Sequence, residues 1–432
     1  LLAIAIPMIL SNITVPLLGL VDTAVIGHLS HAYFLGATAV GSMIITFVIW
    51  FCGFLRMSTS GLAAQAFGKE DQQLMLSILQ RGLFVALAIG FLFICLQSLY
   101  IDLALWLSGG SAEVQQYARQ YSEIRIWGLP AALANLVILG WLLGMHKAKF
   151  AMYLLIVTNI INLVLDLVFV LVLDWQVAGV ARATLIAEYS CFLLGLYLVI
   201  KTLNIKVSEL KSTLLLNGKA IFAKASLKPY LSLNRDIVIR TLCLEICFVF
   251  ITFQGARLGD TVVAANAILL NFLLLISFGL DGIAYGVEAR VGKAFGAQNK
   301  QGLKLAVFTA LKFNFIFAIA YSLFFAIFGM QLITLMSDIP EVVAYTEQFL
   351  LWIIALPIIA CWCYLYDGIY IGMTDASTMR NSMLVSTFLI FFPMWLLLSD
   401  YNNHGLWAAF CLFMLSRGVT LAWHFHSKRL SH

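Results

Sequence analysis

The sequence predicts an all-α integral membrane protein, with about twelve transmembrane helices in two pseudo-symmetric six-helix lobes around a central cleft. Composition is the first reason: of 432 residues, 62% are hydrophobic and 11% are charged, against about 25% charged residues in a soluble domain. The second reason is that apolar runs of about 20 or more residues recur, without the alternation expected of barrel strands. The third is an internal repeat.

Short polar or glycine-rich breaks separate twelve runs that are long enough to cross a bilayer at about 1.5 Å per residue. Several runs exceed 25 residues, so those helices are expected to tilt or protrude. The predicted spans are residues 4–28, 33–66, 75–106, 114–144, 149–173, 178–202, 230–257, 262–292, 303–335, 342–371, 377–398 and 405–427.

Lysine and arginine are distributed unevenly between the two sides. The loops after even-numbered spans, with the C-terminal tail, hold seventeen of them, whereas the loops after odd-numbered spans hold only Arg257. Because positive charge favours the cytoplasmic side, both termini and the even-numbered loops are expected to be cytoplasmic.

The two halves of the chain repeat at a shift of 228 residues. GLAAQAFGKED at 61–71 matches ARVGKAFGAQN at 289–299, and segments starting at 35 and 263, and at 142 and 370, match at the same shift. This shift covers an even number of spans, so both halves share one orientation and an axis along the membrane normal relates them.

The longest connection sets the domain boundaries. We expect an N-terminal lobe at 1–202, a cytoplasmic linker at 203–229 and a C-terminal lobe at 230–432. The linker is basic and partly amphipathic, which favours a segment lying on the anionic inner leaflet. A binding site for a soluble partner is the alternative interpretation.

A single carboxylate stands in the first span, where Asp22 is the only charged residue between Leu1 and Gly27. Inside hydrocarbon such a charge costs several kcal/mol unless it is paired, hydrated or protonated. Its presence therefore indicates a role in moving an ion, a proton or a solute.

Two later spans add polar groups at matched depth. Asn162 and Asp166 are four residues apart in span 5 and share one helix face, and Thr184 lies in span 6. Counted from the outer ends of the spans, Asp22, Asp166 and Thr184 lie roughly 10 Å deep, with Asn162 one turn deeper. Each residue alone is also compatible with a structural hydrogen bond between helices.

These four residues are the predicted cation- or proton-coupling site. Carboxylate, amide and hydroxyl oxygens suit Na⁺ or a shared proton, and two nearby carboxylates do not both ionise readily unless a cation is bound. No metal is expected beyond Na⁺ at Asp22, Asn162, Asp166 and Thr184.

The second half has no copy of this site, because the shift of 228 places apolar residues opposite its members. Glu245 in span 7 and Asp367 in span 10 are candidates for a second-lobe site. Structural pairing with Arg240 or Arg290 is the alternative interpretation of these carboxylates.

Several function classes are disfavoured. The eight cysteines all lie in apolar runs and lack zinc-finger spacing, and the chain has no Walker A motif, G-x-S-x-G or H-E-x-x-H. We therefore expect no ATP-driven pumping, no enzymatic activity and no cofactor. Glu123 and Arg125 in span 4 are interpreted as an internal ion pair.

Specific stretches over nearly the whole chain resemble the MATE (multidrug and toxic compound extrusion) family, most closely its DinF-like branch. They include PMILSNITVPLLGLVDTAVIGHL, RMSTSGLAAQAFG, LANLVILGWLLGMHKA, NIINLVLDLV, LNRDIVIRTL and LDGIAYGVEARVGKAFGAQN. The resemblance implies a multi-pass protein of the bacterial inner membrane that exports cationic or amphipathic organic compounds in exchange for H⁺ or Na⁺, acting as a monomer.

The resemblance also implies residue roles. Asp22 resembles the family's span 1 carboxylate, whose protonation is linked to bending of that helix, and Asn162, Asp166 and Thr184 resemble the rest of the first-lobe network. Glu245 and Asp367 are similar to a second-lobe site of the NorM branch, but the tyrosine expected one turn before that aspartate is Cys363 here.

Two rival functions remain at this stage. A lipid-linked precursor flippase of the wider superfamily would need a cationic central site, whereas the first-lobe cluster is acidic. A non-transporting membrane receptor or enzyme would need a soluble domain or catalytic polar residues at an aqueous face, and neither is visible in the sequence.

Overall fold

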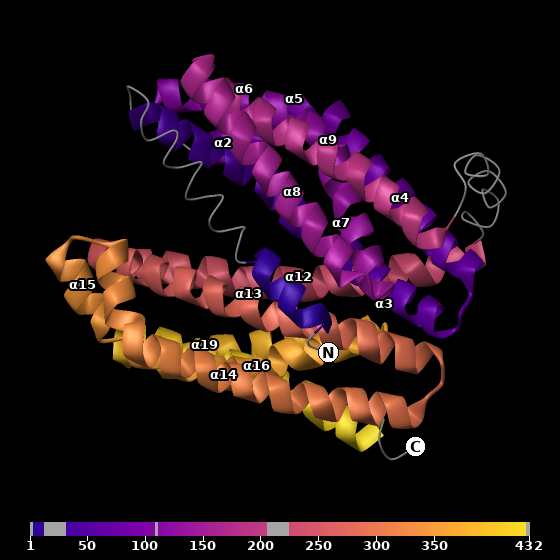
Figure 1. Ribbon diagram of the computed structural model, residues 1–432. Helices are drawn as coiled ribbons and strands as arrows, with labels where there is room; N and C mark the ends of the chain where they lie inside the picture. Colours follow the sequence, from indigo (N-terminus) through magenta and orange to yellow (C-terminus); the bar gives the residue numbers. More distant parts are fainter. Residues whose placement is uncertain (1–2, 13–31, 109–110, 205–223, 429–432) are drawn as a thin grey trace. The chain divides into compact units, whose positions relative to one another are not determined.

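The structure is a computed structural model that describes residues 3–12, 32–108, 111–204 and 224–428. These residues form helices and short connections, and no strand occurs among them, so the predicted all-α class is confirmed (Figure 1). The chain divides into an N-terminal unit, residues 10–230, and a C-terminal unit, residues 1–9 with 231–432. Most of the predicted linker, residues 205–223, lies outside the described residues.

The N-terminal unit is built from helices joined by short turns. They are α2 (Ala32–Phe51), α3 (Phe54–Gly68), α4 (Gln72–Cys95), α5 (Gln97–Ser108), α6 (Ala112–Arg125), η1 (Ile126–Gly128), α7 (Leu129–Gly144), α8 (Ala148–Asp166), η2 (Leu167–Val172) and α9 (Gln176–Leu203).

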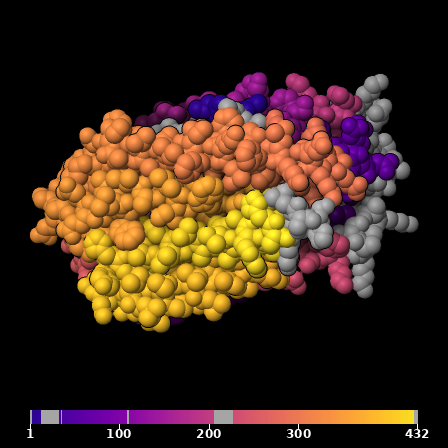
Figure 2. Space-filling view, turned by 90° about the horizontal axis from the view of Figure 1, so that it is seen from below, coloured from indigo at the N-terminus to yellow at the C-terminus, as the bar shows by residue number. Residues whose placement is uncertain are grey.

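The C-terminal unit takes in most of α12 and all later helices, and Figure 2 shows the side on which the orange α14 and the yellow α19 reach its surface. Its helices are α12 (Lys224–Leu258), α13 (Asp260–Gly296), α14 (Lys300–Met336), α15 (Pro340–Glu347), α16 (Leu350–Gly372), α17 (Ala376–Leu384), η3 (Val385–Phe391), α18 (Phe392–Leu397), η4 (Ser399–Tyr401) and α19 (Asn402–Lys428).

Ten stretches of the described helices are long and apolar enough to cross a membrane, and they follow predicted spans 2–6 and 8–12. Predicted span 7 lies within α12, while only the helix Ala3–Asn12 is described from span 1. Spans 3 and 10 are each broken into two helices, after Cys95 and after Glu347. Polar residues stand at each break within the long apolar runs: Gln97 and Ser98 follow the first, and Glu347 and Gln348 stand at the second.

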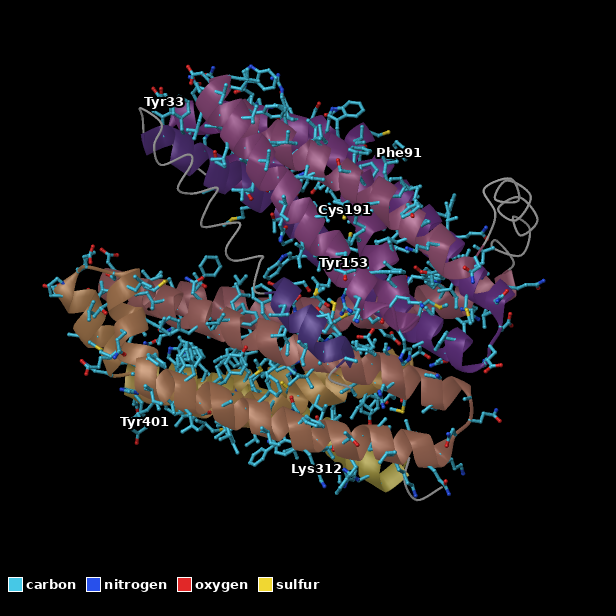
Figure 3. The ribbon with its side chains drawn as sticks, in the orientation of Figure 1. Tyr33, Phe91, Tyr153, Cys191, Lys312 and Tyr401 are labelled. Atoms are coloured by element: carbon cyan, nitrogen blue, oxygen red, sulfur yellow. The ribbon has the colours of Figure 1, made fainter. Side chains whose placement is uncertain are left out.

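Large apolar side chains cover the outside of the helices. Phe91 is 57% exposed and Trp106 is 76% exposed, and Figure 3 shows Phe91 on the outer side of the N-terminal unit. In a bilayer these side chains meet lipid tails, while every helical backbone group is satisfied within its own helix. The exposed apolar side chains therefore agree with a protein surrounded by lipid.

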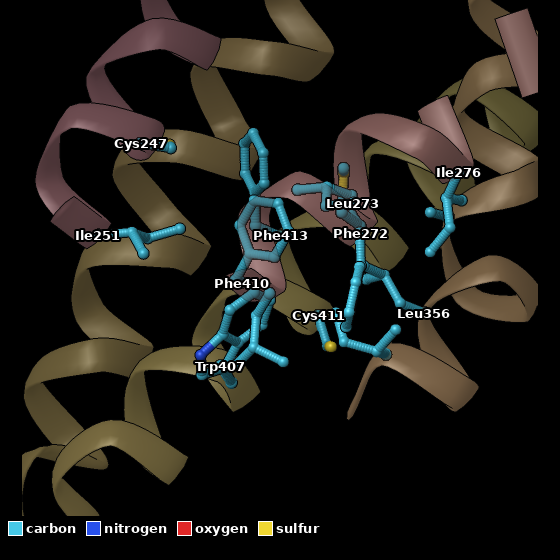
Figure 4. Packing of buried hydrophobic residues seen from close by; sticks show 14 of the residues in the cluster. Cys247, Ile251, Phe272, Leu273, Ile276, Leu356, Trp407, Phe410, Cys411 and Phe413 are labelled. Atoms are coloured by element: carbon cyan, nitrogen blue, oxygen red, sulfur yellow. The ribbon is translucent and has the colours of Figure 1, made fainter. Parts of the chain in front are cut away.

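A continuous aromatic and aliphatic core fills the C-terminal unit (Figure 4). α16 packs against α13, α14 and α19. Trp407 and Phe410 meet edge to face with ring centroids 5.9 Å apart, an arrangement favoured by the quadrupoles of the rings. The helix Ala3–Asn12 also contributes, because an added Cβ on Gly282 would lie 3.0 Å from the Ile9 nitrogen.

Backbone geometry repeats at the shift of 228 residues. Glu70 and Gln298 both have left-handed backbones, with φ of 57° and 54°. The next residues, Asp71 and Asn299, cap the following helix, each accepting a hydrogen bond from the backbone N–H three residues on, at 2.9 and 2.8 Å. Such caps satisfy one of the donors left free at a helix start. The sequence repeat is therefore a structural repeat.

The repeat also fixes how two helices cross in each unit. An added Cβ on Gly144 of α7 would lie 2.6 Å from the Ser60 carbonyl oxygen, and one on Gly372 of α16 would lie 2.6 Å from the Glu288 carbonyl oxygen. Both pairs are related by the same shift. Small residues at a crossing let two membrane helices approach closely, so these glycines set the spacing of α3–α7 and α13–α16.

Candidate functional site

Asn162 and Asp166 lie on the one buried stripe of α8. Ala148, Ala151 and Leu154 continue this stripe toward the start of the helix. Asn162 is 2% exposed and Asp166 is fully buried. Since residues three or four apart share a helix face, the buried face of α8 is apolar in its first half and polar in its second half.

The structure brings Asn162 together with Thr184 of α9. The Asn162 side-chain amide donates a hydrogen bond to the Thr184 hydroxyl at 3.2 Å, and that hydroxyl donates to the Val180 carbonyl at 3.1 Å. The other side-chain atom, Asn162 Oδ1, is buried and has no hydrogen-bond partner among the described residues. The amide is thus oriented by Thr184 with its acceptor oxygen available to a ligand.

Asp166 is the last residue of α8, and the six residues of η2 that follow form a π-helix. Single π-helical turns are rare and occur frequently at functional sites. α9 lies close to this turn, since an added Cβ on Gly179 would be 3.2 Å from the Phe169 carbonyl oxygen. The backbone irregularity therefore directly adjoins the predicted carboxylate.

Asp22, the remaining member of the predicted site, lies outside the described residues, which resume at Ala32 after Asn12. Three of the four predicted residues are therefore placed, all in the N-terminal unit, on α8 and α9.

A buried ion pair lies one turn along α9 from Thr184. It was not predicted from the sequence. Arg125 Nη1 of α6 lies 2.6 Å from Glu188 Oε2, and Asn135 of α7 donates to the Glu188 carbonyl at 2.9 Å. The expected pairing of Arg125 with Glu123 is wrong: Glu123 is exposed and lies 3.9 Å from Arg119. Residues two apart on a helix point to different sides, so the inward arginine needs a partner on another helix.

The second-lobe candidates form a different arrangement. Asp367 is buried and accepts hydrogen bonds from two guanidinium groups, Arg417 at 2.8 Å and Arg240. The structure therefore pairs Asp367 with Arg240, which was the alternative interpretation of this carboxylate. Both guanidinium groups bind the same oxygen, Asp367 Oδ2, so fixed positive charges compensate this carboxylate.

No hydrogen bond or ion pair joins Glu245 to Asp367 within the described part of the chain, although Glu245 interacts electrostatically with Arg240, a partner of Asp367. Cys363, at the position where a tyrosine was expected, donates its thiol to the Ala360 carbonyl. The neighbouring Tyr364 is hydrogen-bonded to Ser277. Within the described part of the C-terminal unit, Asp367 therefore belongs to a polar network that includes two arginines.

Two repeated helical units with carboxylates buried inside their spans are typical of membrane transporters. Comparison with known proteins agrees: the sequence model of the MatE family matches residues 7–168 and 237–396, and the chain belongs to this family.

Individual relatives agree with this assignment. The chain is 43% identical over 428 residues to DNA damage-inducible protein F of Escherichia coli strain K12, covering 98% of this chain and 91% of that protein. It is 23% identical over 440 residues to multidrug resistance protein MdtK of Photorhabdus laumondii, covering 98% and 93%. A solved outward-facing conformation of a multidrug resistance MATE family transporter matches with a TM-score of 0.87 at 19% identity, covering 98% of this chain and 94% of that chain. This last likeness shows the fold.

Proposed function

We propose that this chain is a secondary active multidrug efflux antiporter, which exports cationic or amphipathic organic compounds in exchange for H⁺ or Na⁺. Membership of the MatE family and relatives named multidrug resistance proteins support the export of drug-like compounds. The buried polar groups of α8 and α9 support coupling to a small cation.

One observation carries the coupling proposal: a fully buried carboxylate, Asp166, lies one turn from the oriented amide of Asn162. An acceptor such as Asn162 Oδ1 that is buried without a donor costs about 1–3 kcal/mol. A bound Na⁺, or a proton on an adjacent carboxyl group, supplies the missing partner. The site therefore favours the cation-loaded state.

In the proposed mechanism Asp22 is the coupling carboxylate, Asp166 shares the cation, and Thr184 holds Asn162 in place. Loading neutralises charge inside the membrane, where an unpaired carboxylate is costly. A cation drives the transport cycle only through its different affinity for the two conformations of the transporter. Entry from outside and release inside would therefore supply the free energy for export.

The proposal includes an orientation and a location. The excess of lysine and arginine in the even-numbered loops and the C-terminal tail supports cytoplasmic termini. The bacterial relatives support placement in an inner membrane as a multi-pass protein. We expect the functional unit to be a monomer, because the cation-site residues come from one chain.

The test is efflux of ethidium from cells that express Asp22→Asn, with the exposed Asp400→Asn as the matched control. We expect Asp22→Asn to abolish efflux and drug resistance while membrane insertion and protein level are unchanged. Asp400→Asn should behave as the unaltered chain. Unchanged ethidium efflux in Asp22→Asn would refute the assignment.

A further inference from the structure

An apolar groove runs along the surface of the C-terminal unit between α14 and α19. It has two adjoining stretches, of about 480 and 390 Å³, which share Leu311 of α14 and His426 of α19. Both helices pack against α16, whose Trp362 and Tyr366 line the second stretch. The side with these two helices faces the viewer in Figure 2.

The groove is polar at one end and apolar along the rest. Lys304, in the second turn of α14, and His426, near the end of α19, line the first stretch. Leu415 and Trp362 line the second stretch. The eleven steps from Leu415 to His426 rise about 16 Å along the helix. This shape, a cationic end joined to a long apolar channel, matches the two parts of a phospholipid.

A second lysine, Lys312, does not itself line the groove, but its ammonium lies over a ring that does. Lys304, Phe308 and Lys312 are four residues apart on one face of α14. The Lys312 ammonium lies 4.9 Å from the centre of the Phe308 ring, so its side chain runs back toward Lys304, as helical side chains tend to do. Figure 3 shows Lys312 on the outer side of the unit.

Neither lysine has an acidic partner among the described residues. A charged residue inside a membrane span usually marks a function and has a definite counter-group. His426, which lines the first stretch with Lys304, is hydrogen-bonded to the Tyr366 hydroxyl at 3.0 Å. The described part of the protein therefore supplies no counter-ion for the lysines at the cationic end of the groove.

We propose that this groove binds one anionic phospholipid. Lys304 and Lys312 contact its phosphate and acidic headgroup, with His426 at the edge of that site, and one acyl chain lies along Leu311 and Leu415. Basic pockets between membrane helices bind anionic headgroups in this way. A zwitterionic lipid fills the same channel but leaves the lysines uncompensated, so the site discriminates by headgroup charge.

The test is native mass spectrometry of the full chain, purified from vesicles of phosphatidylcholine and phosphatidylglycerol in equal parts. We expect phosphatidylglycerol to be retained in preference. The preference should fall roughly thirtyfold in Lys304→Gln/Lys312→Gln, because each lysine near anionic lipid contributes about 1 kcal/mol and about 1.4 kcal/mol is a factor of ten. The matched control is Lys201→Gln, because Lys201 also lies over a ring, that of Phe150 at 5.7 Å, but belongs to the N-terminal unit rather than to the helices that form the groove.

A second variant tests the acyl channel. Val419 lines the groove and is 56% exposed, so Val419→Trp should obstruct the channel without disturbing the core. We expect it to reduce retention of both lipids, with the size-exclusion profile unchanged. Equal retention of the two lipids by the unaltered chain, the same loss in Lys201→Gln, or a lipid-free dimer that Val419→Trp dissociates would each overturn the proposal.

Discussion

The Asn162 amide donates a hydrogen bond to the Thr184 hydroxyl at 3.2 Å, which ties α8 to α9 one turn from the buried carboxylate of Asp166. The hydroxyl is itself fixed because it donates to the Val180 carbonyl. The orientation of Asn162, and with it the direction of Asn162 Oδ1, therefore depends on one hydroxyl group of the neighbouring helix.

Replacing Thr184 by valine should weaken cation binding. Thr184→Val keeps the shape of the side chain but leaves a buried amide donor without its acceptor, a cost of about 1–3 kcal/mol. We expect the concentration of coupling ion that gives half-maximal efflux to rise about tenfold, since 1.4 kcal/mol is a factor of ten. The measurement is efflux against ion concentration in proteoliposomes. Thr184→Ser retains the hydroxyl and should behave normally, so equal ion dependence in both variants would contradict this role.

Removing half of the Arg125–Glu188 pair should destabilise the N-terminal unit. Glu188→Gln leaves a buried guanidinium without its counter-charge, and breaking a buried pair costs about 3–5 kcal/mol. We expect a clearly lower midpoint of thermal unfolding in detergent. The double variant Arg125→Met/Glu188→Leu removes both charges and should recover most of the loss. A double variant no more stable than Glu188→Gln would show that the pair is not the cause.

We expect Asp367 to stabilise the C-terminal unit, as Glu188 stabilises the N-terminal unit. Asp367→Asn leaves Arg240 and Arg417 buried without their shared carboxylate, so a loss of about 3–5 kcal/mol is expected. Glu245→Gln, on a partly exposed side chain with no ion pair among the described residues, should change the unfolding midpoint little. The comparison is made by thermal unfolding of the purified variants. Equal stability of Asp367→Asn and the unaltered chain would count against a locked network.

The glycine crossings give a prediction that is independent of transport. In Gly144→Ala the new Cβ would lie 2.6 Å from the Ser60 carbonyl oxygen, and a backbone oxygen cannot move aside cheaply. We expect reduced folded yield and a lower unfolding midpoint, and the same from Gly372→Ala. Gly36→Ala is the matched control, because its Cβ would meet only Val114 at 3.5 Å, an ordinary contact. Equal yields for all three variants would mean that the crossings can relax.

Much of the fold could be predicted from the sequence because the bilayer makes long apolar runs obligatory for spans. The repeat could also be detected in the sequence. Asp71 and Asn299 cap the helices that follow them, so the local backbone favours a capping side chain at both positions. The break after Cys95 was not predicted, because Gln97 and Ser98 are only a short polar interruption in a long apolar run.

For the candidate site, the spacing of Asn162 and Asp166 was sufficient to place both on one face of α8. The partners of the arginines were harder to find. Arg125 pairs with a residue 63 positions away, and Arg240 with one 127 positions away. No helical period links such positions, so only the packing of the helices determines these pairs.

The most direct test of the account is the response of purified protein in proteoliposomes to a pH gradient and a Na⁺ gradient, imposed separately, with Asp166→Asn as the variant. Asp166→Asn preserves side-chain shape in a fully buried position and removes the negative charge. We predict that one gradient drives ethidium transport by the unaltered chain and that neither drives it through Asp166→Asn. Gradient-driven transport by Asp166→Asn at the rate of the unaltered chain would contradict coupling through the polar cluster of α8 and α9.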